Sequence, residues 1–179
     1  MALLIATGVV AATTPSAADW EQPFVVHASI GEPITGRNIA VTVHAATVTD
    51  RVFDDRWSST PGSTWVVVDA SAAVVHTETA ATIRHAVLVV GDRSYAASMR
   101  PSAFMLNSVA LSIDVPTRGW LAFELPADAL SAKGAERARL ELAMNADPRL
   151  DSMIVATIDL TTVPALAEVE LSDAVWGER

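Results

Sequence analysis

Four histidines are the first candidates for chemistry in this chain. His27, His44, His76 and His85 each lie in or beside a predicted strand, and two or three of them could converge across sheets on Zn²⁺ or Cu²⁺. No two of them are within four residues of each other, so no metal-ligand spacing connects them. Histidines in strands are more commonly surface residues or hydrogen-bonded core residues. The sequence therefore keeps metal handling only as an alternative and predicts no cofactor.

An acidic loop is the second candidate. Asp50, Asp54 and Asp55 have the charge of a calcium-binding loop but not its alternating spacing, and a solvated turn explains them better. The chain contains no nucleophile elbow, phosphate-binding loop, zinc-protease helix or dinucleotide fingerprint. A triad that is assembled only in space leaves no such trace. We predict a protein that is not an enzyme and has no catalytic residues.

Tryptophan is the unusual residue type, because five tryptophans accompany a single tyrosine. Trp57 falls in the predicted loop 50–63, whereas Trp65 and Trp120 lie on the strand faces opposite to their apolar neighbours. Tryptophan is enriched at interface hot spots, and exposed aromatic rings also stack on sugars. We therefore predict an interaction surface of Trp57, Trp65 and Trp120. The alternative is that these indoles cover one sheet face beneath the loop or the C-terminal segment.

The first 18 residues contain no charged side chain and end in Ser16-Ala17-Ala18, a tripeptide of the kind that signal peptidase cuts. We expect residues 1–18 to be an export signal or membrane anchor that places the rest of the protein outside the cytoplasm. The first basic residue is Arg37, so the basic start of a secretory signal is missing. A signal with an incomplete start, a truncated anchor and a buried hydrophobic strand all remain open.

Composition excludes several kinds of chemistry and of binding partner. Without cysteine, the chain has no disulfide framework and no thiolate chemistry. The net charge is −9, and Lys133 is the only lysine. An acidic surface argues against nucleic acid and against an anionic membrane surface as partners. We expect contact with a membrane only through the N-terminal segment.

Apolar and polar residues alternate along most of the remaining chain, as in strands with one buried face. In the first long strand, Ile39, Val41, Val43 and Ala45 are predicted to share the apolar face. The predicted strands are 24–30, 38–45, 65–74, 86–90, 95–97, 120–125, 139–144 and 154–160. Only 127–132 favours a short helical turn. Seven or more strands with almost no helix predict an antiparallel β-sandwich over residues 19–161, with a closed barrel as the alternative.

Three segments of this pattern occur in a particular order: GSTWVVVDA at 62–70, the 88–98 hairpin with its Gly91-Asp92 turn and Tyr95, and GWLAFELP at 119–126. Together they resemble the telokin-like, immunoglobulin-like secreted domains of unknown function found in Gram-positive lipoproteins. The fold of the mycobacterial immunoprotective extracellular antigen is similar. The resemblance covers residues 24–160 and implies an immunoglobulin-like sandwich exported to the cell surface, with no catalytic residues to transfer. The chain lacks the lipidated cysteine of those lipoproteins.

The C-terminal segment, 162–179, is less regular, and Ala167–Leu171 is predicted as an added edge strand. Two hypotheses follow from the whole sequence. The first is a non-catalytic module that binds a protein or glycan, or has a structural role, at the cell envelope. The second is a small-ligand or metal-handling extracytoplasmic protein that uses the strand histidines.

Overall fold

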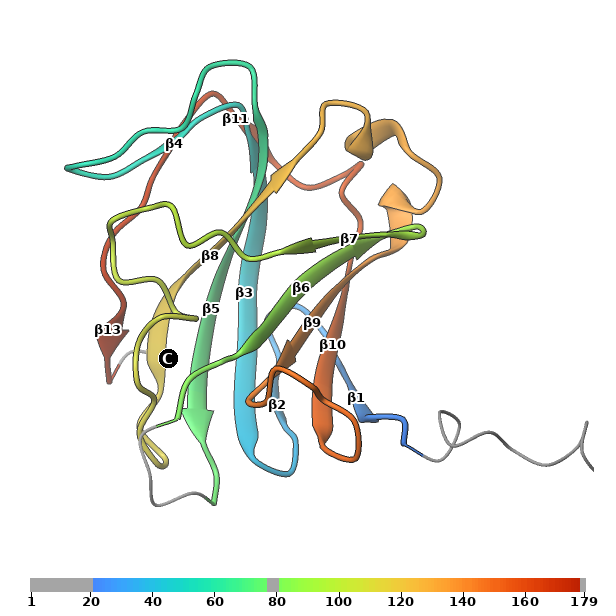
Figure 1. Cartoon of the computed structure of the whole chain (residues 1–179), viewed down its shortest axis with the longest axis vertical. Coiled ribbons are helices and arrows are strands. Elements are labelled where there is room, and N and C mark those ends of the chain that lie inside the picture. The colour runs from blue at the N-terminus through green and yellow to red at the C-terminus, as the bar shows by residue number, and fades with distance from the viewer. Residues whose placement is uncertain (1–20, 77–80, 178–179) are drawn as a thin grey trace, which may run out of the picture.

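Two β-sheets packed face to face form the fold (Figure 1), in a computed structural model that describes residues 21–76 and 81–177. The prediction of a β-sandwich is therefore confirmed. The predicted export segment, residues 1–18, lies outside the described residues. Within the described parts of the chain, no helix is long and apolar enough to span a membrane.

The first sheet, called sheet A here, has the strand order β1-β10-β9-β6-β7. Its strands are β1 (Phe24–Ala28), β6 (His85–Val90), β7 (Arg93–Ala96), β9 (Ala138–Ala143) and β10 (Ser152–Ile158). β1 lies parallel to β10, whereas the other pairs are antiparallel. The predicted hairpin turn between β6 and β7 requires glycine at Gly91. Its φ is +62°, and an added Cβ would lie 2.5 Å from the carbonyl oxygen of Lys133.

The second sheet, called sheet B here, has the order β11-β3-β5-β8-β13, and β2 also pairs with β3. Its strands are β2 (Pro33–Thr35), β3 (Ile39–Thr49), β5 (Thr64–Val74), β8 (Thr117–Leu125), β11 (Ala165–Leu166) and β13 (Val175–Trp176). A third, two-stranded sheet joins β4 (Val52–Phe53) to β12 (Val169–Glu170). Two 3₁₀ turns, η1 (Ala129–Ser131) and η2 (Ala135–Arg137), precede β9, and η1 falls within the predicted helical turn.

The main core lies between the two sheets and follows the alternation of the sequence. Sheet B contributes residues such as Val66, Val68 and Phe123, and sheet A contributes residues such as Leu88 and Leu140. Each of these side chains is fully buried. Burial of a side chain of this size contributes about 1.5–3 kcal/mol, so the inward faces of the long strands are the main source of stability.

A β-bulge interrupts the alternation in β3. The register against β5 shifts between Val43 and Ala45, so one extra residue, His44, is accommodated. Beyond the bulge, Ala46 occupies the buried position and Ala45 is exposed. The prediction that Ala45 shares the apolar face of Val43 is therefore wrong, because period-two counting fails wherever a strand contains an unpaired residue.

The C-terminal segment packs along sheet B. β11 pairs with β3 at one edge, β12 pairs with β4, and β13 pairs with β8 at the other edge. In Figure 1 this segment runs in red from β11 to β13. β12 lies within the predicted edge strand 167–171, and the following Leu171 is buried. The segment thus covers part of the sandwich.

Candidate functional site

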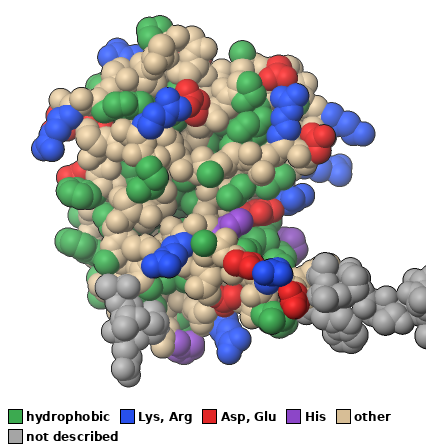
Figure 2. All heavy atoms as spheres, viewed as in Figure 1, with side chains coloured by type: hydrophobic (Ala, Val, Ile, Leu, Met, Phe, Trp, Pro, Cys, Tyr) green, Lys and Arg blue, Asp and Glu red, His purple; other side chains and the backbone are tan. Residues whose placement is uncertain are grey.

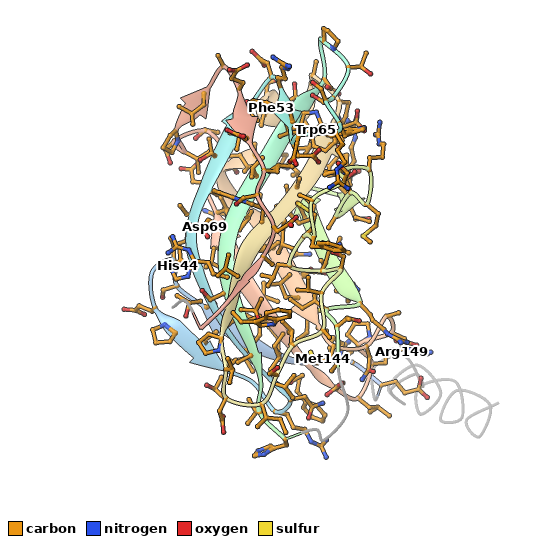
Figure 3. The ribbon with its side chains drawn as sticks, turned by 90° about the vertical axis from the view of Figure 1, so that its left-hand side faces the viewer. His44, Phe53, Trp65, Asp69, Met144 and Arg149 are labelled. Atoms are coloured by element: carbon orange, nitrogen blue, oxygen red, sulfur yellow. The ribbon has the colours of Figure 1, made fainter. Side chains whose placement is uncertain are left out.

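The outer face of sheet B, which points away from the main core, is divided into two parts. One part carries Trp65, Val67 and Ala122 and is covered by other segments of the chain. We call it the closed half. The other part carries His44 and Ser71 and is hollowed into a groove. Figure 3 shows Trp65 near one end of the sheet, and Asp69 and then His44 progressively further along it.

Trp65 is the centre of the closed half and has no exposed surface. It packs in a second apolar cluster with Met105 and Leu171. The ring of Trp57 meets it edge to face, with 5.9 Å between the ring centroids. Its indole N–H donates a 2.9 Å hydrogen bond to Ser63 Oγ. Trp65 therefore cannot contact a partner, and its assignment to an interaction surface is corrected. It fills a small core beneath a loop and the C-terminal segment, which confirms for this residue the alternative that the sequence left open.

Trp57 and Trp120 border the same cluster but are only partly buried. The indole N–H of Trp120 donates a 3.2 Å hydrogen bond to Ser172 Oγ on the C-terminal segment. Both residues are accessible to solvent in part. The predicted surface of three tryptophans is thus reduced to these two.

Asp54 connects the two loops that cover the closed half. Its carboxylate accepts hydrogen bonds from the backbone N–H groups of Arg56, Trp57, Ser102 and Ala103, and from Ser102 Oγ at 2.5 Å. Burial raises the pKa of Asp54, but the hydrogen bond from Ser102 and those from the backbone lower it further, so the net pKa lies well below its ordinary value. Asp54 is thus a buried structural anion, which corrects the prediction of a solvated turn at this position.

The other members of the acidic loop, Asp50 and Asp55, are exposed as predicted for a turn. The carboxylate oxygens of Asp54 are already occupied by protein donors. Within the described residues, no group of three or more His, Asp or Glu side chains could hold a metal ion. The described residues of the acidic loop therefore form no ligand cluster for calcium.

The four histidines do not converge. His27 lies on β1, His44 on β3, His85 on β6, and His76 just beyond the end of β5. His85 Nε2 lies 3.5 Å from a carboxylate oxygen of Glu141 on the neighbouring strand. The metal-handling hypothesis receives no ligand set from the part of the chain that the structure describes.

The groove on sheet B encloses about 430 Å³. This volume is within the range of small-ligand sites. Small side chains at its base explain the hollow, because Ala40, Thr42 and Ala73 do not reach far from the sheet. His44 lies on this face as well, in alternation with Ala40 and Thr42. The residues around the groove are Gly31, Pro33, Ala40, Val41, Thr42, His44, Ser71, Ala72, Ala73, Asp114 and Pro116.

His44 and Ser71 form a hydrogen-bonded pair in this groove. Nε2 of His44 lies 2.6 Å from Oγ of Ser71, and Ser71 is 4% exposed. The nearby carboxylate of Asp69 accepts two hydrogen bonds from Arg118, at 3.0 and 2.7 Å. Asp69 is thereby engaged with Arg118 and does not orient His44. The pair can donate and accept hydrogen bonds at the base of a ligand site.

An exposed apolar strip adjoins the groove. We call it the apolar rim, and it consists of Phe104, Ile113, Val115, Val175 and Trp176. Backbone hydrogen bonds connect its three segments: Ala174 N–H donates to Phe104 O, and Gly177 N–H donates to Pro116 O, both at 2.8 Å. Figure 2 shows hydrophobic side chains along the margin on which Figure 1 draws β13.

Sequence reasoning missed both the rim and the groove. Trp176 was the available signal for the rim, since it is the fifth tryptophan and lies in a segment rich in polar residues. It is 62% exposed. For the groove, alternation alone placed Ser71 on the outer face, but nothing local indicates that Asp114 lies beside it.

No family model matches the chain, and no curated protein matches it. Two solved structures are similar. One is an uncharacterised β-sandwich protein from Clostridium difficile 630, with a TM-score of 0.50, 11% identity, and coverage of 81% of this chain and 99% of that protein. The other is a candidate lipoprotein from Staphylococcus aureus, with a TM-score of 0.51, 6% identity, and coverage of 79% and 97%.

These similarities define the class of protein, a β-sandwich domain of unknown function. At such low identity they concern the fold alone. They do not support the telokin-like family in particular, so that assignment stays a prediction.

Proposed function

We propose that this chain is a non-catalytic, immunoglobulin-like module that acts outside the cytoplasm at the cell envelope. It binds a protein partner through the apolar rim. The sequence also allowed a glycan partner, and the experiment below distinguishes the two. The observation that carries the proposal is the rim itself. Phe104, Val175 and Trp176 are 64%, 48% and 62% exposed on hydrogen-bonded neighbouring segments. Val175 and Trp176 are consecutive in β13, so their side chains leave opposite faces of this edge strand and the rim is an apolar edge of the sheet. Exposed apolar side chains that gather on neighbouring segments mark sites of interaction in soluble proteins.

The strand order supports the immunoglobulin-like assignment. β3, β5 and β8 occupy the places of strands A, B and E in one sheet. β6, β9 and β10 occupy those of C, F and G in the other, and β7 follows β6 at the edge as C′ does. Such sandwiches use their surfaces and loop ends for binding in many unrelated proteins. β1, parallel to β10, is an addition to this pattern.

Two observations support a location at the envelope. Residues 1–18 are uncharged and end in a small-residue tripeptide suited to signal peptidase. A candidate lipoprotein from S. aureus has a similar fold. A protein partner is favoured over a glycan because the rim mixes aliphatic and aromatic side chains, as the cores of protein interfaces do.

Retention of the purified chain on intact envelope preparations tests the proposal. The double variant Phe104→Ala, Trp176→Ala should lose about 30-fold in retention, because two rim side chains of hot-spot type are removed. Phe24→Ala is the matched control, since Phe24 is 60% exposed but lies on β1 in the other sheet. Unchanged retention of the rim variant would overturn the proposal.

Two further arms complete this experiment. Protease treatment of the envelope should abolish retention, whereas loss only after glycan digestion would replace the protein partner by a glycan. Trp57→Ala tests the surface predicted from the sequence. If this variant is retained as well as the natural chain, the partner contacts the rim and does not contact the loop that carries Trp57.

A further inference from the structure

We propose that the groove on sheet B is a subsite for a lysine or arginine side chain of the partner polypeptide. This inference rests on the proposed function, because it assigns a chemistry to the surface that adjoins the apolar rim. The connection is direct in the chain: Asp114 and Pro116 border the groove, and the rim residues Ile113 and Val115 flank Asp114.

Charge selects a cationic ligand. Asp114 carries the only carboxylate among the residues that line the groove, and none of the lining residues is Lys or Arg. Glu32 does not line the groove, but it is exposed in the chain between the lining residues Gly31 and Pro33 and adds a negative charge to this part of the surface. The nearby cation Arg118 is bound in a two-bond pair to Asp69. An anionic ligand would therefore meet the negative charge of Asp114 at the groove, whereas a cation is attracted to it.

The floor of the groove suits a side chain rather than an added strand. β3 and β5 pair with each other along the groove except at the bulge, where His44 has no partner, so most of their backbone groups are already used in the sheet. A ligand must then be recognised by side chains. The His44–Ser71 pair offers hydrogen bonds at the base, and Pro33, Ala40 and Ala73 offer apolar contact for a methylene stem.

Asp114 is held in place by its backbone. Its φ is +57°, in the left-handed region, and its N–H donates a 3.1 Å hydrogen bond to the carbonyl of Val74. Asparagine tolerates this conformation as well as aspartate does. Asp114→Asn therefore removes the charge while leaving the loop conformation accessible, which makes it a suitable test variant.

The probes are four N-acetylated, C-amidated tripeptides with alanine at both ends and lysine, arginine, norleucine or glutamate in the centre. They are titrated against the full chain while NMR signals of the Ala40 and Ala73 methyl groups and the His44 ring are followed. The lysine and arginine peptides should shift these signals and bind about two- to fivefold more tightly than the norleucine peptide, as expected for a solvent-exposed ion pair. The glutamate peptide should bind least.

Asp114→Asn should abolish the preference for lysine over norleucine, and Ala73→Leu should fill the floor and weaken the binding of all four peptides. Asp55→Asn is the control, because Asp55 is an exposed carboxylate in the loop beside the closed half. Equal binding of the lysine and norleucine peptides, or shifts confined to signals away from the groove, would overturn the inference.

The two proposals fail separately. Trp176→Ala should leave tripeptide binding unchanged, because Trp176 does not line the groove. If the rim variant loses envelope retention while no basic peptide enters the groove, the proposed function stands and the subsite is wrong. If basic peptides bind but the rim variant keeps its retention, the subsite stands and the role of the rim is wrong.

Discussion

The closed half and the groove lie on one face of one sheet, yet one is covered and the other is open. The closed half presents Trp65 and Val67 on β5, which bury a large apolar area once a loop and the C-terminal segment pack over them. Four and six residues beyond Val67 on the same strand, Ser71 and Ala73 present little apolar area. Burial energy scales with apolar area, so only the first region stabilises a covering segment.

This difference separates the residues that hold the fold from those that can meet a ligand. The covering loops of the closed half are joined by the buried Asp54 carboxylate. In the groove, the polar pair His44–Ser71 is among the residues that line the hollow and is within reach of a ligand there. Substitutions in the two regions should therefore affect different measurements, stability in one and binding in the other.

The largest loss of stability is expected for Trp65→Ala. Removal of a fully buried indole should cost about 3–5 kcal/mol in the free energy of unfolding, because its contacts are lost and the surrounding structure relaxes only partly into the cavity. Urea unfolding followed by circular dichroism measures it. Trp176→Ala is the control and should change the value by no more than about 0.5 kcal/mol. Equal effects would contradict the distinction between a buried and an exposed tryptophan.

Asp54→Ala should have the next largest effect, about 2–3 kcal/mol, because several backbone N–H groups and the Ser102 hydroxyl lose their acceptor. Ser102→Ala removes only one of these bonds and should cost about 1 kcal/mol. The comparison is made by urea unfolding at pH 7. A cost of Asp54→Ala no larger than that of Ser102→Ala would show that the backbone hydrogen bonds contribute little.

The same carboxylate predicts a pH dependence. The folded-state pKa of Asp54 is lowered below its ordinary value of 3.8, so the unfolded state binds the proton first as the pH falls. The stabilisation is therefore fully present above about pH 5 and is lost as the pH falls below 4. Asp147 and Asp159 also have lowered pKa values, so the informative quantity is the difference between the natural chain and Asp54→Asn. That difference should shrink between pH 5 and pH 2.

The smallest effect is expected in the groove. Ser71→Ala removes one hydrogen bond to His44 and no large apolar area, so we expect a loss of about 1 kcal/mol in unfolding free energy. The same variant should perturb the His44 ring signals in NMR spectra. A cost near that of Trp65→Ala would mean that the groove residues hold the fold, and the contrast between the two regions would fail.

Much of the sandwich was predictable because alternation is a local property. The sides of Val66 and Trp65 followed from their positions in one strand, and both residues lie on the expected faces. The segments that cover the outer face of sheet B, in contrast, come from distant parts of the sequence. Trp65 was proposed as a surface residue, since the strand pattern cannot show that Met105 and Leu171 lie above it. The bulge at His44 was also invisible, because it depends on pairing with β5.

By itself, the order of residues in this chain determined the long strands, most of the inward faces of the sandwich and the hairpin turn at Gly91, because each depends on neighbours a few positions away. Only the tertiary structure decided which outer residues are covered and which are open. Asp54 and Ser102 are 48 positions apart, and His44 and Ser71 are 27 apart. Such pairs meet through sheet register and loop packing, which the local pattern does not encode.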